Sequence, residues 1–91
     1  MEKSLTYKYN SALLIDDNGL DNFINQKMLE VTHFSKKIHI STDGQMALDF
    51  LNEIIISNKN NITSYPEIIF VDINMPVMGG FEFIENFKKL Q

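Results

Sequence analysis

The alternation of apolar and polar stretches along the chain predicts three strands. Residues 12–15 and 68–71 are continuous apolar runs, which are typical of strands buried on both faces of a parallel sheet. In residues 38–41 apolar and polar side chains alternate, which predicts a half-exposed strand at a sheet edge. We therefore expect one sheet with two fully buried strands and one edge strand.

Helical periodicity follows each of these runs. Apolar residues recur at helical spacing at positions 20, 23, 24, 28 and 31, at 47, 48, 51, 54 and 55, and at 81, 84 and 87. Thr42 and Gln45 have the spacing of a capping box at the start of the second helix. Alternating strands and helices predict an α/β fold with parallel strands joined by right-handed crossovers. In the flavodoxin-like arrangement the strand order is 2-1-3.

The polar segments between these elements predict the connections. Residues 1–10 are expected to be a leader that runs into the first strand, and residues 32–37 a connection. Residues 58–64 are rich in turn formers and predict a loop, as do residues 75–80 with one proline and two glycines. No internal linker or repeat interrupts the chain, so residues 1–91 are expected to form a single domain.

The composition excludes several classes of function. The net charge of −4 and the pI near 4.9 argue against nucleic-acid binding by this segment. The absence of cysteine excludes disulfides and thiolate zinc sites. No apolar stretch approaches the roughly 20 residues of a membrane span, and no apolar core of a signal peptide follows Met1. We therefore expect a cytoplasmic location with no membrane contact.

Three aspartates follow the two continuous apolar runs. Asp16 and Asp17 come directly after the first run, and Asp72 comes directly after the third predicted strand. In the 2-1-3 order these strands are neighbours, so the three carboxylates are expected at one edge of the sheet, where open α/β folds bind ligands. Carboxylates this close repel one another, and a divalent cation relieves the repulsion.

The ligand atoms of this predicted cluster are all oxygens. Such ligands favour Mg²⁺, and Mn²⁺ as an alternative, over zinc. An aspartate beside Mg²⁺ can act as a nucleophile toward a phosphoryl group and form an aspartyl phosphate. The acidic cluster therefore predicts metal-assisted phosphoryl transfer.

Two segments carry a resemblance to a known family. Residues 13–18, LLIDDN, and residues 71–81, VDINMPVMGGF, resemble the receiver domain of two-component response regulators, and they occur at the separation typical of that family. The resemblance extends over essentially the whole chain from about Ser11 and implies a flavodoxin-like fold.

The resemblance implies a role for each acidic residue. It implies that Asp72 is the phosphoacceptor, that Asp17 binds Mg²⁺ directly, and that Asp16 helps directly or through water. The main-chain carbonyl of Asn74 would complete the protein ligands. The implied phosphodonor is a phosphohistidine on a sensor histidine kinase or a histidine phosphotransfer protein. By the same resemblance the chain is not an enzyme beyond catalysing its own phosphorylation and dephosphorylation.

The sequence departs from the family in one respect. The family has five strands and this chain supplies three, so it resembles a partial receiver domain truncated after the third helix. The hydroxyl residue after strand four and the lysine after strand five, which contact the phosphoryl group in the family, have no counterpart here. The third strand would then expose an apolar edge, which predicts self-association through that edge.

Two alternative functions remain open. A phosphatase of the haloacid-dehalogenase type also uses an aspartate after a strand, but it needs a second aspartate two residues later, where this chain has Asn74. A receiver-like module that cannot be phosphorylated and serves interaction or dimerisation is the other alternative. Binding of Mg²⁺ discriminates the signalling function, which requires the cation, from the interaction module, which does not.

Overall fold

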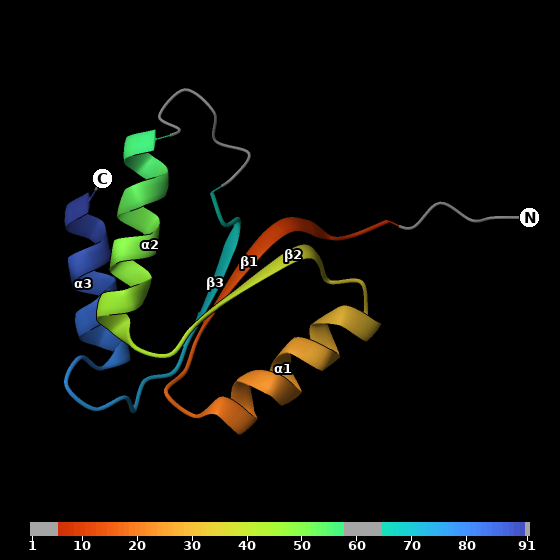
Figure 1. Cartoon of the computed structure of the whole chain (residues 1–91), viewed down its shortest axis with the longest axis horizontal. Helices are drawn as coiled ribbons and strands as arrows, with labels where there is room; N and C mark the ends of the chain where they lie inside the picture. The colour runs from red at the N-terminus through yellow and green to blue at the C-terminus, as the bar shows by residue number, and fades with distance from the viewer. Residues whose placement is uncertain (1–5, 58–64, 91) are drawn as a thin grey trace, which may run out of the picture.

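Three parallel strands and three helices alternate along the chain. The computed structural model describes residues 6–57 and 65–90. The elements are β1 (Tyr9–Ile15), α1 (Gly19–Val31), β2 (Ser35–Ser41), α2 (Gly44–Ser57), β3 (Ile68–Val71) and α3 (Gly80–Leu90) (Figure 1). The strands form one sheet in the order β2-β1-β3, with both pairings parallel. The predicted α/β class, element order and strand order are confirmed.

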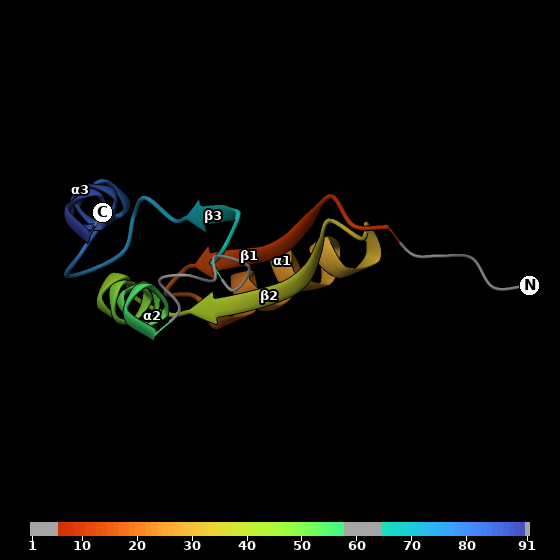
Figure 2. The same cartoon turned by 90° about the horizontal axis from the view of Figure 1, so that it is seen from above.

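The helices lie on opposite faces of the sheet. Figure 1 shows α1 on one side of the overlapping strands and α2 and α3 next to each other on the other side, and Figure 2 shows the strands side by side in the order β3, β1, β2 with α1 behind them. The core lies on the side of α2 and α3, and its buried members are Leu13, Ile15, Ala47, Leu48, Leu51, Met75 and Phe83. The face toward α1 is less well covered.

Strand β1 is the buried centre of the sheet. Residues 12–15 are at most 3% exposed, because β2 and β3 flank them and helices cover both faces. Leu14, for example, pairs with Ile40 on one side and with Phe70 on the other. The prediction of a strand buried on both faces is confirmed for β1, and β2 is the predicted edge strand.

Two strands begin earlier than expected. β1 begins at Tyr9 and β2 at Ser35, whereas the pattern predicted a leader through residue 10 and a connection over residues 32–37. The register pairs Tyr9 with Ser35, and the rings of Tyr9 and Phe34 pack 5.0 Å apart. Backbone pairing does not depend on side-chain polarity, so the polar residues that begin both strands do not produce the apolar pattern from which strands are predicted. Residues 1–5 of the expected leader lie outside the described residues.

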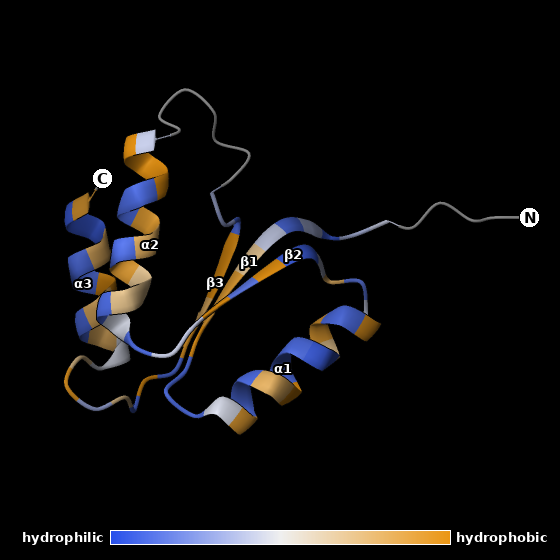
Figure 3. Ribbon diagram, in the orientation of Figure 1, coloured by the Kyte–Doolittle hydropathy of each residue, from blue (hydrophilic) through white to orange (hydrophobic). Residues whose placement is uncertain are grey.

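The large apolar side chains of α1 are largely exposed. Its large apolar side chains are 47–76% exposed, and they are Leu20, Phe23, Ile24, Met28 and Val31. Figure 3 shows orange, hydrophobic segments between blue, hydrophilic ones along α1. Periodicity predicts which residues share a helix face, but it does not say what covers that face. The expected amphipathic helix is present, with its apolar face exposed.

Strand β3 is less buried than its sequence predicts. Its four residues are half-buried or exposed, and Phe70 is 38% exposed. Among the described residues β3 pairs with β1 alone, so it is an edge strand. Ile69 and Val71 pack on the core, whereas Phe70 is on the face of α1 and lies 5.8 Å from the ring of Phe34. The prediction of burial on both faces is wrong for β3, and self-association through its edge stays a prediction.

The starts of α1 and α2 are capped by side chains. Asn18 accepts a hydrogen bond from the amide of Asp21 (3.0 Å) at the start of α1. Asp43 does the same for the amide of Met46 (2.7 Å) at the start of α2, so the cap is one residue later than the predicted Thr42. The predicted loop at residues 58–64 lies outside the described residues. No helix in the described part of the chain is long and apolar enough to cross a membrane.

Candidate metal centre

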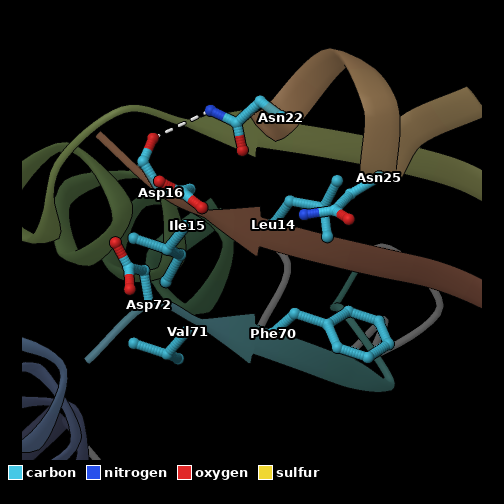
Figure 4. Close-up of a pocket in the computed structure, with 8 residues that line it drawn as sticks. All are labelled: Leu14, Ile15, Asp16, Asn22, Asn25, Phe70, Val71 and Asp72. Atoms are coloured by element: carbon cyan, nitrogen blue, oxygen red, sulfur yellow. Dashed lines mark hydrogen bonds between the residues drawn. The ribbon is translucent and has the colours of Figure 1, made fainter. Parts of the chain in front are cut away.

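The ends of β1 and β3 bring three aspartates together. The amide of Asp72 donates to the carbonyl of Ile15 (2.9 Å), and the amide of Asp16 donates to the carbonyl of Ser41 (3.2 Å), so the three strands end in register. Asp16, Asp17 and Asp72 each offer a carboxylate oxygen, and these oxygens lie within 4.8 Å of one another. The expected meeting of the three carboxylates at one sheet edge is confirmed, and Figure 4 shows Asp16 and Asp72 there.

The surroundings of Asp16 disfavour its ionised form. Partial burial raises the pKa of Asp16 above its usual value, and the negative charges of Asp72, Asp21 and Asp17 raise it further. A hydrogen bond from the amide of Asn18 to Oδ1 of Asp16 (3.0 Å) acts in the opposite direction. A positive charge placed among the carboxylates would lower the energy of their ionised forms.

The loop after β3 holds Asp72 in place. The amide of Asn74 donates to Oδ1 of Asp72 (3.3 Å), and the amide of Gly80 donates to the carbonyl of Ile73 (3.1 Å). A Cβ atom at position 80 would lie 2.8 Å from the carbonyl oxygen of Asp72, so only glycine allows this approach of α3. The loop therefore depends on Gly80. The main-chain carbonyl of Asn74 stays a predicted ligand.

Two cavities adjoin the cluster. One, of about 240 Å³, lies between α1 and the sheet and is lined by Leu14, Ile15, Asp16, Asn22, Asn25, Phe70, Val71 and Asp72 (Figure 4). The other, of about 500 Å³, lies between the start of α2 and the loop after β3 and includes Asp17 in its lining. The carboxylates are therefore reachable from both sides.

The sequence pattern did not single out Asn22. Its side chain is 3% exposed, its Nδ2 donates to the main-chain oxygen of Asp16 (2.8 Å), and it lines the smaller cavity. A signal was available, because Asn22 is a polar residue in the first turn of the predicted helix, six positions after Asp16. Polar residues on a predicted helix are common on the solvent side, so the pattern alone did not distinguish a buried one.

The donor set fits Mg²⁺. Three carboxylates supply hard oxygen ligands, and Mg²⁺ in proteins uses one or two such ligands and keeps several waters. In the described part of the chain this is the one group of three or more acidic, histidine or cysteine side chains close enough to hold a metal ion. The arrangement suits a hard divalent cation at the phosphate-binding edge of an α/β sheet.

Comparisons with known proteins identify the fold. The structure superposes on a two-component response regulator from Cytophaga hutchinsonii with a TM-score of 0.79, 39% sequence identity and coverage of 90% of this chain and 58% of that chain. The fold is that of a response regulator receiver domain. The receiver domain of a histidine kinase from Arabidopsis thaliana, in complex with Mg²⁺ and BeF₃⁻, gives a TM-score of 0.80 at 21% identity and coverage of 89% of this chain and 56% of that chain. At that identity the second similarity supports the fold alone.

Sequence relatives agree with the receiver fold. A protein-glutamate methylesterase/protein-glutamine glutaminase from Treponema pallidum is 27% identical over 81 residues, which are 89% of this chain and 18% of that protein. A probable methanogenesis regulatory protein from Methanothrix harundinacea is 26% identical over 77 residues, or 85% of this chain and 47% of that protein. No family model matches the sequence. The chain thus spans less than half of these relatives and somewhat more than half of the solved receiver chains.

Proposed function

We propose that the chain is the phosphoacceptor of a two-component phosphorelay and that Asp72 accepts the phosphoryl group. The observation that carries the proposal is the meeting of Asp16, Asp17 and Asp72 within 4.8 Å at the carboxyl ends of β1 and β3. The receiver fold supports it, and so does the cavity that Asp16 and Asp72 line, next to a second cavity lined by Asp17.

The proposed reaction is an in-line substitution at phosphorus. A carboxylate oxygen of Asp72 attacks the phosphorus atom of a phosphohistidine, the P–N bond breaks, and the imidazole leaves with the bonding electrons and takes up a proton. The product on this chain is an acyl phosphate at Asp72. The amide of Asn74, which donates to Oδ1 of Asp72, orients the carboxylate.

The cation site in this proposal consists of Asp16, Asp17, Asp72 and the main-chain carbonyl of Asn74. Bound Mg²⁺ would neutralise charge on the phosphoryl oxygens and on the carboxylates. Asp17 is the most exposed of the three carboxylates and is the proposed direct ligand, while Asp16 acts directly or through water. A receiver domain of a histidine kinase from Arabidopsis thaliana forms a complex with Mg²⁺, and this supports Mg²⁺ as the cation by analogy.

The partner follows from the same chemistry. The phosphodonor would be a sensor histidine kinase or a histidine phosphotransfer protein, and the exchange would take place in the cytoplasm. The chain would act on no other substrate, so its catalysis would be limited to its own phosphorylation and dephosphorylation.

A phosphorylation-independent interaction module is a second candidate. The exposed apolar side chains of α1 favour it, and so does the edge of β3 that pairs with no strand among the described residues, because such surfaces are typical of interaction sites. That function does not require Mg²⁺. A melting temperature unchanged by millimolar Mg²⁺ would favour it over the phosphoacceptor function.

Residue mapping tests the proposal. After incubation with acetyl phosphate and Mg²⁺, borohydride reduction converts an aspartyl phosphate to an alcohol, and peptide fragmentation locates the modified residue. We expect the modification at Asp72. Modification at Asp16, Asp17 or another residue would overturn the assignment.

A further inference from the structure

Asn22 is buried in a helix whose apolar side chains are exposed. It is the one buried residue of α1, and its side chain is 3% exposed, whereas Met28 on the same helix is 59% exposed. A polar side chain buried this completely needs hydrogen-bond partners, because burial removes its contacts with bulk water. We therefore consider the hydrogen-bond partners of Nδ2 and Oδ1 of Asn22 in turn.

The Nδ2 group of Asn22 has a protein partner. It donates to the main-chain oxygen of Asp16 (2.8 Å), and the backbone amide of Asn22 donates to the carbonyl of Asn18 (3.0 Å) in the first turn of α1. These bonds tie the end of β1 to α1. They fix the main chain that carries Asp16 and the adjoining Asp17.

The Oδ1 atom of Asn22 is buried and has no hydrogen-bond partner among the described residues. Figure 4 shows this oxygen pointing toward the cavity, away from the bond to Asp16. Two other buried side-chain oxygens, on Ser11 and Tyr65, share this property, but neither residue lines the cavity. Only Asn22 places an unpartnered buried acceptor in the cavity that Asp16 and Asp72 also line.

We propose that Asn22 is a positioning residue of the metal centre, where Nδ2 fixes Asp16 and Oδ1 accepts a hydrogen bond from a water that bound Mg²⁺ carries. Mg²⁺ keeps several of its waters in protein sites, and these waters need acceptors. Partners beyond the direct ligands orient such sites, and their loss weakens metal binding about 10- to 100-fold. The inference rests on the proposed function, because it requires that the three aspartates bind the cation.

The first test compares Asn22→Leu with Asn25→Leu. Both residues line the cavity, but Asn25 is exposed and does not bond Asp16. Calorimetric titration of the full chain with MgCl₂ should give a Kd at least about tenfold higher for Asn22→Leu and within about twofold of the parent for Asn25→Leu. Far-ultraviolet circular dichroism establishes that each variant is folded. A folded Asn22→Leu with the parental Kd would overturn the proposal.

The second test separates Oδ1 from Nδ2. Asn22→Asp keeps an acceptor oxygen and loses the donor, while Asn25→Asp adds the same charge to the same cavity without replacing the acceptor. We expect Asn22→Asp to bind Mg²⁺ at least about fivefold more tightly than Asn22→Leu after correction for the charge effect measured with Asn25→Asp. Equal corrected affinities would overturn the role of Oδ1. If Asn22→Leu does not fold, Asn22→Ala replaces it in both comparisons.

The outcome separates the inference from the proposed function. If the parent binds Mg²⁺ and Asn22→Leu binds it equally well, the role of Asn22 fails and the phosphoacceptor proposal stands. If the folded parent binds no Mg²⁺ at millimolar concentrations, both fail together.

Discussion

The amide of Asp72 donates a hydrogen bond of 2.9 Å to the carbonyl oxygen of Ile15, the residue that precedes Asp16. This bond extends the parallel pairing of β3 with β1 by one residue and brings Asp72 beside Asp16. The site is therefore a consequence of strand register, because a shift of β3 by one residue would turn Asp72 to the opposite face of the sheet.

The first prediction is that the ionised carboxylate of Asp16 lowers the stability of the metal-free protein but contributes to cation binding. Burial and neighbouring negative charges raise the pKa of Asp16 above 3.8, so the folded protein holds this proton more tightly than the unfolded chain. Stability of the metal-free protein should therefore fall as the pH rises from 3.8 through the raised pKa. Asp16→Asn should raise the urea midpoint of the metal-free protein at neutral pH and weaken Mg²⁺ binding.

The control for this prediction is Asp49→Asn, which changes an exposed carboxylate on α2 outside the acidic cluster. Its urea midpoint should stay close to that of the parent. A lower midpoint for metal-free Asp16→Asn would show that the ionised carboxylate stabilises the fold, contrary to our expectation.

The second prediction concerns the contact between α3 and the end of β3. A Cβ atom at position 80 would lie 2.8 Å from both the carbonyl oxygen of Asp72 and the Cα of Ile73, so Gly80→Ala must displace backbone. We expect a loss of about 1–3 kcal/mol in the free energy of unfolding, together with weaker Mg²⁺ binding because Asp72 moves. Gly19→Ala is the matched control, because a Cβ there meets no atom within 4 Å. Equal stability of the two variants would contradict the close approach.

The third prediction concerns Val77, which has a left-handed backbone with φ of 64° and a fully exposed side chain. This conformation costs a β-branched residue about 1–2 kcal/mol, and glycine adopts it freely. Val77→Gly should therefore stabilise the protein relative to Val77→Ala, which retains Cβ, by up to about 1 kcal/mol in urea unfolding. If Val77→Ala proves the more stable variant, the left-handed conformation is not a source of strain.

The fourth prediction concerns His39 on β2, whose ring lies 4.7 Å from that of Phe50. Burial, and secondly the charge of Lys37, lowers the pKa of His39 below 6.5. The unfolded chain then binds a proton at higher pH than the folded protein does, so stability should fall as the pH decreases from 6.5 toward the lowered pKa. His39→Gln should flatten the pH dependence of the unfolding free energy in this window.

His33 provides the control for this measurement. It is exposed and has a positive φ of 53°, which asparagine tolerates, so His33→Asn is the matched replacement of the other histidine. A His39→Gln variant with the slope of the parent would contradict the effect of burial at His39.

The sequence pattern predicted the site better than it predicted the surface. The positions of Asp16, Asp17 and Asp72 follow from two apolar runs that end in acidic residues and from the rule that parallel strands end at the same edge. The exposure of Phe70 and of the apolar face of α1 did not follow, because periodicity records which residues share a face and not which elements cover it.

Three other features were not accessible from residue types. The start of β2 at Ser35 depends on backbone pairing with Tyr9, which polar side chains do not signal. The left-handed backbone of Val77 contradicts the preference of β-branched residues, so no propensity rule predicts it. The burial of Asn22 depends on its contact with the main chain of Asp16, a relation that only the folded structure contains.

The central claim is that Asp72 accepts a phosphoryl group, and intact mass measurement tests it most directly. The chain and its Asp72→Asn variant would be incubated with Mg²⁺ and acetyl phosphate, with circular dichroism to establish that both are folded. The account predicts one phosphoryl increment on the parent and none on the variant. An increment on both, or none on a folded parent that binds Mg²⁺, would contradict it.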